Sequence, residues 1–224
     1  MKNKIIKLLV KLRLIKDPKR KERRHALVGS AKRWKIKQDF QIKFLKDQGL
    51  KEDDVFLDIG CGTLRGGIPI IKFLNIGNYY GVDIRENAIE EAKNELIEEK
   101  LTQKIGGLIL FEKFENLKIN TRFNKMLAFS VLIHLSDDIL YECLKFVKNN
   151  LTDEGVLYAN VNIGDNDQGS WLEFPVMFKT LDFYKSICDK LDLKFDVLGE
   201  LKELGHVSGD ELSDKQLMLK IYKA

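Results

Sequence analysis

The chain has 224 residues, 44% of them apolar, which suits one α/β domain with a sizeable core and a short extension. Its charged fraction of 32% is not that of a disordered chain, and no run reaches the roughly 18–20 apolar residues of a membrane span. Three widely separated cysteines without a CxxC motif favour reduced thiols in a cytoplasmic protein. The net charge of +4 is uneven, because residues 1–37 carry fifteen Lys or Arg and two acids.

The first 24 residues are expected to form a basic amphipathic arm before a domain over residues 25–224. Apolar residues recur at helical spacing within residues 1–16 with lysines between them, which predicts a helix that ends before Pro18. Residues 19–24 read as a charged connector. Three interpretations stay open: contact of residues 1–16 with an anionic membrane surface, nucleic-acid binding, and a solvated arm or oligomer contact. The apolar face counts against nucleic acid.

Beyond a second helix, expected over about residues 30–48 and ended by Gly49, strands and helices alternate. Strands are expected over residues 55–59, 78–84, 108–111, 125–130, 155–163, 194–198 and 216–222, and helices over 68–74, 87–100, 136–150 and 180–191. This alternation predicts a doubly wound, mostly parallel sheet covered on both faces, with the last two strands as antiparallel neighbours. A ligand of such a sheet binds at the carboxyl ends of the strands, where the strand order reverses.

A glycine-rich turn follows the first of these strands. Gly60, Gly62 and Gly66 give the spacing G-x-G-x-x-x-G, one residue longer than a dinucleotide fingerprint. Asp58, just before the turn, would repel a pyrophosphate, whereas it would attract a cationic ligand. The spacing and Asp58 therefore disfavour an NAD oxidoreductase. The alternative to a ligand-binding turn is an ordinary tight connection between a strand and a helix. Asp83 ends the next strand, about 20 residues on, where an acid accepts hydrogen bonds from ribose hydroxyls. Its alternative role is in a strand-end turn or as a helix N-cap.

Three segments together resemble the class I methyltransferases that depend on S-adenosylmethionine (SAM): VFLDIGCG at 55–62, GVD at 81–83 and AFSVLIHL at 128–135. The resemblance spans about residues 25–224. It implies a Rossmann-like, seven-stranded sheet with an antiparallel terminal strand, SAM as cofactor and S-adenosylhomocysteine (SAH) as its product. It also implies a set of cofactor-binding residues: Asp58, Gly60, Cys61, Gly62, Asp83, Ile84, Glu112, Phe114 and Ser130. Within this set Asp83 would hold the ribose, and Ile84, Glu112 and Phe114 would lie near the adenine.

Candidates for the acceptor site follow from their places in the expected order of strands and loops. His134, just past the fourth strand, is a candidate general base, with a structural histidine as the alternative. His206, between the last two strands, is a second candidate base or a solvated loop histidine. Arg65, Trp171 and Trp34 are candidate substrate contacts, with surface or core roles as alternatives. Residues 165–171 are expected to form a lid, and no His, Cys, Asp and Glu spacing indicates a metal.

Leu64 stands where many family members have a third glycine. The segment LRGG at 64–67 resembles a subgroup of bacterial enzymes from surface-polysaccharide gene clusters. The resemblance thus implies O-methylation of a small molecule or of a sugar- or nucleotide-linked precursor of a surface polysaccharide. An RNA methyltransferase is the main alternative, and a SAM-binding protein without catalysis is another. The expected location is the cytoplasm, with a peripheral position at the inner membrane face as one option.

Overall fold

The computed structural model describes residues 20–29, 31–165 and 169–224. The helix expected over residues 1–16 and the middle of the expected lid lie outside these ranges. Within them, no helix is both long and apolar enough to cross a membrane.

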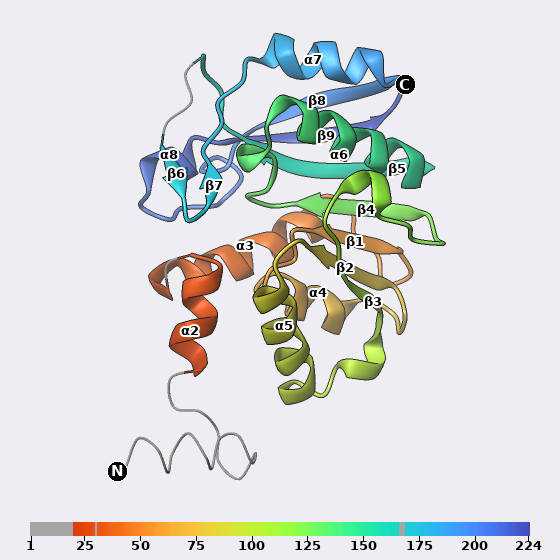
Figure 1. Cartoon of the computed structure of the whole chain (residues 1–224), viewed down its shortest axis with the longest axis vertical. Helices are drawn as coiled ribbons and strands as arrows, with labels where there is room; N and C mark the ends of the chain where they lie inside the picture. The colour runs from red at the N-terminus through yellow and green to blue at the C-terminus, as the bar shows by residue number, and fades with distance from the viewer. Residues whose placement is uncertain (1–19, 30, 166–168) are drawn as a thin grey trace.

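A single seven-stranded sheet forms the centre of the molecule. Its strands are β1 (Phe56–Ile59), β2 (Tyr79–Asp83), β3 (Ile105–Leu110), β4 (Phe123–Ala128), β5 (Leu151–Val161), β8 (Leu193–Glu200) and β9 (Leu217–Lys223). The strand order is β3-β2-β1-β4-β5-β9-β8, from bottom to top in Figure 1. The four pairs from β3 to β5 are parallel, and β9 is antiparallel to both β5 and β8. This confirms the expected sheet, with the antiparallel strand last in the chain but inside the sheet.

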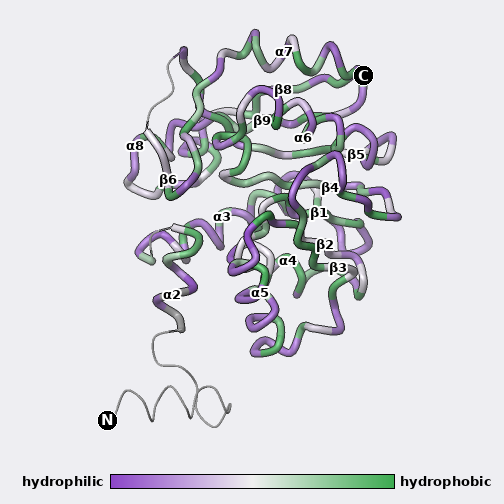
Figure 2. Tube along the Cα trace, viewed as in Figure 1, coloured by the Kyte–Doolittle hydropathy of each residue, from purple (hydrophilic) through white to green (hydrophobic). Residues whose placement is uncertain are grey.

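Helices cover both faces of the sheet. One buried cluster joins α6 (Asp137–Asn150) and α7 (Leu181–Lys190) to alternate strand residues such as Leu57 and Met126. The other joins α3 (Trp34–Asp47), α4 (Gly67–Phe73) and α5 (Glu86–Glu98) to the intervening residues, such as Phe56 and Leu127. Figure 2 shows the hydrophobic residues gathered along the strands. Burial of both strand faces explains the nearly continuous apolar runs of the central strands.

Two strands begin earlier than expected. β3 starts at Ile105 rather than at residue 108, and β5 at Leu151 rather than at 155. Gly106 and Gly107 suggest a turn, yet a Cβ on Gly106 would overlap the carbonyl of Gly77 and the ring of Tyr80. Glycine is needed there because the strand backbone passes close to its neighbours, not because the chain turns.

The N-terminal segment is helical rather than a connector. Helix α2 (Arg20–Leu27) spans the expected boundary at residue 24. Arg24 forms an ion pair with Glu95 of α5, and its guanidinium lies 4.6 Å from the ring of Trp34. His25 stacks on the same ring, with centroids 4.2 Å apart. These contacts attach α2 to the domain. The expected boundary between arm and domain therefore falls within a packed helix. A short 3-10 turn (Ala31–Arg33) then leads into α3, and Gly49 follows that helix with the expected positive φ of 80°.

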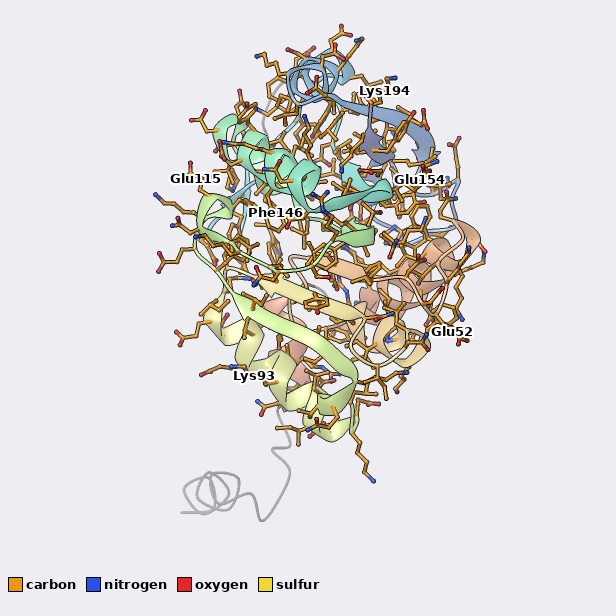
Figure 3. The ribbon with its side chains drawn as sticks, turned by 90° about the vertical axis from the view of Figure 1, so that its right-hand side faces the viewer. Glu52, Lys93, Glu115, Phe146, Glu154 and Lys194 are labelled. Carbon is orange, nitrogen blue, oxygen red and sulfur yellow. The ribbon has the colours of Figure 1, made fainter. Side chains whose placement is uncertain are left out.

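Three short elements were not anticipated. They are β6 (Ser170–Trp171) and β7 (Phe174–Pro175), which pair as a hairpin, and α8 (Glu211–Asp214). They lie near the N-terminal end of α3, at the left of Figure 1. The opposite end of the molecule faces the viewer in Figure 3, where Glu52, Glu154 and Lys194 extend into solvent.

Candidate functional site

A cavity of about 470 Å³ lies where the strand order reverses, at the carboxyl ends of β1 and β4. This volume is in the range of small-molecule sites. Its lining includes eight residues expected from sequence: Asp58, Gly60, Cys61, Gly62, Arg65, Ser130, His134 and Trp171. It also includes residues that were not expected, among them Arg33, Lys37, Arg85, Asn162, Asp210 and Gln216. The structure thus brings together the turn after β1, the loop after β4 and the β6–β7 hairpin.

The turn after β1 depends on two glycines in the left-handed region. Gly60 has φ of 70° and Gly62 has φ of 54°, which strongly favour glycine. A Cβ on Gly62 would lie 2.7 Å from Cγ1 of Val28, and one on Gly60 would overlap the side chain of Val131. The backbone N–H of Gly62 donates to Oδ2 of Asp83 at 2.8 Å. The turn is therefore held closely against both neighbouring strands and the chain before α3.

Opposite charges border the cavity beside this turn. Asp58 is 5% exposed and its Oδ2 accepts a hydrogen bond from the hydroxyl of Tyr79 at 2.7 Å. Burial raises the pKa of Asp58 to about 7, although the Tyr79 hydrogen bond opposes this shift. Arg65 donates from Nη1 to the carbonyl of Val28 at 2.6 Å, while its buried Nε has no partner. Burial lowers the pKa of Arg65 to about 10, so it stays protonated at neutral pH. An acid and a base at one end of the cavity fit the zwitterionic end of an amino-acid-like ligand.

Asp83 is occupied by donors of the protein itself. Its Oδ1 accepts from the backbone N–H of Arg85 at 2.9 Å and lies 3.4 Å from Nε of the same residue. Arg85 also donates from Nη1 to the carbonyl of Leu27 at 2.6 Å. Asp83 is 4% exposed and does not line the cavity, whereas the guanidinium of Arg85 lies 5.6 Å from the ring of Trp171. Asp83 is not the N-cap of α5, because Arg85 takes that position. Its hydrogen bond with the N–H two residues on fits the other alternative, a strand-end turn.

The three residues expected near an adenine lie away from the cavity lining. Ile84 is 47% exposed and Glu112 is exposed, both just beyond the ends of their strands. Phe114 is buried and its ring packs on Phe111 and Phe146, with centroids 4.9 and 5.9 Å away. Core packing therefore explains the burial of Phe114, and an adenine contact by Ile84 and Glu112 stays a prediction.

His134 has one defined tautomer. Its Nδ1 lies 2.7 Å from the carbonyl of Pro175, and a carbonyl only accepts, so Nδ1 carries the proton. Nε2 is then the unprotonated nitrogen, and the imidazole is a base with a free lone pair. The ring stacks against Trp171, with centroids 5.6 Å apart, and burial lowers the pKa of His134. Because the hairpin carbonyl fixes the ring at the cavity wall, this residue has the geometry expected of a general base.

His206 does not share this position. Its side chain is fully buried, lies against the rings of Phe40 and Phe129, and is not part of the cavity lining. Its Nδ1 lies 3.2 Å from Oδ1 of Asp214, and its Nε2 is buried without a partner. The alternative of a solvated loop histidine is wrong, because the side chain is fully buried. A role as a second base stays a prediction, for a side chain that does not line the cavity. The loop folds back over α3, which buries it.

Trp34 also lies outside the lining. Its ring stacks on His25, and the guanidiniums of Arg24 and Arg65 lie 4.6 and 5.9 Å from its centroid. Trp34 therefore lies beside Arg65 but outside the cavity lining. Within the described ranges, no group of three or more His, Cys, Asp or Glu could hold a metal ion.

Sequence reasoning missed the basic side chains contributed by the start of α3. The missed residues are Arg33 and Lys37, which line the cavity four residues apart, and Gln41 lines it four residues further on. Residues four apart lie on one helix face, so this spacing was the available signal. This spacing was overlooked because Arg33 and Lys37 were counted only as part of the positive charge of residues 1–37.

Comparisons with known proteins agree with this geometry. Residues 57–157 match the family model described as a methyltransferase domain. No protein with curated annotation matches the chain.

Many solved structures share the fold. One is a SAM-dependent methyltransferase from Clostridium acetobutylicum ATCC 824, 18% identical over 85% of this chain and 92% of that one, with a TM-score of 0.62. Another is magnesium protoporphyrin IX methyltransferase from Synechocystis PCC 6803 with bound SAM, 13% identical over 86% and 80% of the chains, with a TM-score of 0.62. A third is mitomycin 7-O-methyltransferase, 16% identical over 84% of this chain and 54% of that one, with a TM-score of 0.59. At these identities the likeness concerns the fold.

Proposed function

We propose that this methyltransferase transfers a methyl group from SAM to an oxygen of a small-molecule acceptor bound in the cavity beside His134. The observation that carries the proposal is one cavity bordered by the Asp58–Gly62 turn and by a histidine whose Nε2 is free. The domain that matches a methyltransferase family spans this turn and His134.

The residues of the turn suit SAM. Asp58 is placed to hold the ammonium group, and the partnerless Nε of Arg65 to hold the carboxylate of the methionine part. Gly60 and Gly62 keep the backbone open beneath the same part of the ligand. When bound, SAM supplies an electrophilic methyl group attached to a sulfonium.

His134 would remove the proton of the acceptor hydroxyl. Nε2 would hold this proton as the hydroxyl oxygen takes up the methyl group of SAM, and SAH would be the other product. The carbonyl of Pro175 stabilises the resulting imidazolium, because it accepts a hydrogen bond from Nδ1–H both before and after the proton transfer. Trp171 covers one face of the imidazole and limits the access of water.

Several observations favour a small acceptor over RNA. The cavity has the volume of a small-molecule site, and the chain beyond residue 37 carries a net charge of −9. Two of the similar structures are named for small-molecule acceptors, a magnesium porphyrin and mitomycin. A sugar- or nucleotide-linked precursor of a surface polysaccharide is our finer proposal, and it rests on the LRGG segment alone. Contact of residues 1–16 with the inner membrane face also stays a prediction.

The proposal is tested with SAM that carries an isotopically labelled methyl group. The purified full chain is incubated with separate extracts of small metabolites, glycolipids and RNA. We expect label in the metabolite or glycolipid fraction. Label confined to RNA would replace the proposed acceptor class, and binding of SAM with no label in any fraction would favour a non-catalytic protein.

A further inference from the structure

Lys37 is a half-buried lysine at the cavity, and none of the described residues forms an ion pair or a hydrogen bond with its ammonium group. It lies on α3 and lines the cavity. Its ammonium lies 5.8 Å from the ring centroid of Phe129. A cation that is partly withdrawn from water and has no direct counter-ion is disfavoured, so a lysine in this position suggests that an anion binds to it.

The cavity lining carries four cations, Arg33, Lys37, Arg65 and Arg85, and two acids, Asp58 and Asp210. Arg33 is paired with Asp210 at 2.5 Å, and Arg85 with the carboxylate of Asp83. Among the lining residues, Lys37 and Arg65 then remain with one acid, Asp58, while Asp214 acts on Lys37 from outside the lining. SAM would bring two positive groups and one carboxylate, so it deepens the positive excess rather than removing it. Its single carboxylate accounts for at most one of the two free cations.

Lys37 and Arg65 lie on different sides of the cavity. Arg65 follows the glycine turn, and its positive charge acts on Asp58. Lys37 stands close enough to His134 for its charge to lower the pKa of that residue. Lys37 is therefore the free cation on the side of the candidate base, where the acceptor would bind, and Arg65 is the one on the cofactor side.

We propose that the acceptor carries an anionic group, a carboxylate or a phosphoryl group, which Lys37 binds inside the cavity. This inference rests on the proposed function and specifies its substrate class. The ion pair would anchor the acceptor at one end and direct a hydroxyl at its other end toward His134. Arg33, one helical turn before Lys37, lines the same wall with its charge paired to Asp210.

The protonation of Lys37 gives an independent readout. Burial, followed by the charges of Arg65 and Arg33, lowers the pKa of Lys37 to about 7, while Asp210 and Asp214 act in the opposite direction. The two neighbouring histidines are His134 and His206. At pH 8 most of the free protein therefore has a neutral Lys37, and an anion that binds to the ammonium form must draw a proton from the buffer.

The test uses the full chain saturated with SAH, so that the carboxylate of the cofactor already occupies its own site. Sulfate and acetate are titrated separately by calorimetry at pH 8, in two buffers of different ionisation enthalpy. Neither anion titrates at this pH. Sulfate represents a phosphoryl group and acetate a carboxylate, so the tighter binder identifies the acceptor anion.

We expect one anion to bind alongside SAH with a millimolar dissociation constant and with proton uptake. Lys37→Met should weaken it at least about tenfold, and Lys37→Arg should retain it. Lys35→Met is the matched control, because Lys35 is an exposed lysine on the same helix, paired with Asp39. It should bind like the wild type.

Three results would overturn the inference: no binding of either anion, equal binding by Lys37→Met, or displacement of SAH by the anion. The proton uptake is measured on the wild type, so the test does not depend on a variant that folds. Failure to bind SAH would instead remove the proposed function itself, and the two failures are therefore distinguishable.

Discussion

Asn160 donates a hydrogen bond from Nδ2 to Oε1 of Gln216 at 2.6 Å, and both side chains are buried. This bond is the centre of a chain of amides beneath the cavity. Oδ1 of Asn160 accepts from the backbone N–H of Ser130 at 2.7 Å, and Gln216 donates to Oδ1 of Asn162 at 2.9 Å. The chain joins the end of β4 to the start of β9 and holds Ser130 at its positive φ of 60°. The floor of the cavity is thus fixed by polar rather than apolar contacts.

Gln216→Met should lower the free energy of unfolding by about 2–3 kcal/mol, because it leaves two buried amide groups without partners. Chemical denaturation of the purified variant measures this loss. The control is Gln103→Met at an exposed position, which should change the free energy by less than about 0.5 kcal/mol. Equal stability of the two variants would show that the amide chain is not required.

The affinity for SAM should fall by about eightfold between pH 7.5 and pH 6. A carboxylate holds an ammonium group only when ionised, and the pKa of Asp58 is about 7, so acidification removes the charge that binding needs. Calorimetric titrations across this range measure the slope. Asp58→Asn should bind SAM more weakly at pH 7.5 and with little pH dependence. A variant that keeps the wild-type slope would place the titrating group elsewhere.

Gly62→Ala should damage the site more than Gly77→Ala does. Both glycines have positive φ, so both variants lose about 1–2 kcal/mol from backbone strain. Only at Gly62 does the new Cβ meet a neighbour, Cγ1 of Val28, whereas nothing lies within 4 Å at Gly77. We expect a larger fall in melting temperature for Gly62→Ala and a loss of SAM affinity of at least about tenfold. Adding Val28→Ala should restore part of the stability; identical behaviour of the two single variants would refute the steric argument.

His134→Gln should reduce turnover by about 10²–10⁴-fold while leaving SAM affinity unchanged. The pKa of His134 lies below its usual 6.5 because of burial, and only the neutral ring is a base. With SAM saturating, wild-type turnover should therefore decline only as the pH falls below about 6.5. Steady-state kinetics across pH test both points. Normal turnover of the variant would assign His134 a structural role.

Much of the cofactor side of the site could be predicted because its signal is local. The turn at Gly60 and Gly62 and the acid at Asp58 occur within five residues, directly after an apolar strand. The acceptor side depends on the packing of distant segments. Lys37 reaches the cavity only because α3 crosses the strand ends, and His206 is buried only because its loop folds over that helix. Neither fact has a signature in the spacing of neighbouring residues.

The same distinction applies to the fold. Alternating apolar segments predicted the order of strands and helices, but the starts of β3 and β5 were missed. Gly106 looks like a turn residue in isolation, and only the ring of Tyr80 on the adjacent strand explains it. Helix α2 was read as a connector because the ion pair of Arg24 with Glu95 joins residues about 70 positions apart.

Calorimetric titration of SAM into the wild type and Asp83→Ala tests most directly whether the turn after β1 is the cofactor site. Asp83 holds the N–H of Gly62 and the backbone of Arg85, so its loss should loosen the turn and remove the acid expected to meet the ribose. Asp53→Ala, at an exposed position before β1, is the control. The account predicts one SAM per chain for the wild type and the control, and binding at least about tenfold weaker for Asp83→Ala. Equal affinity of all three proteins would contradict it.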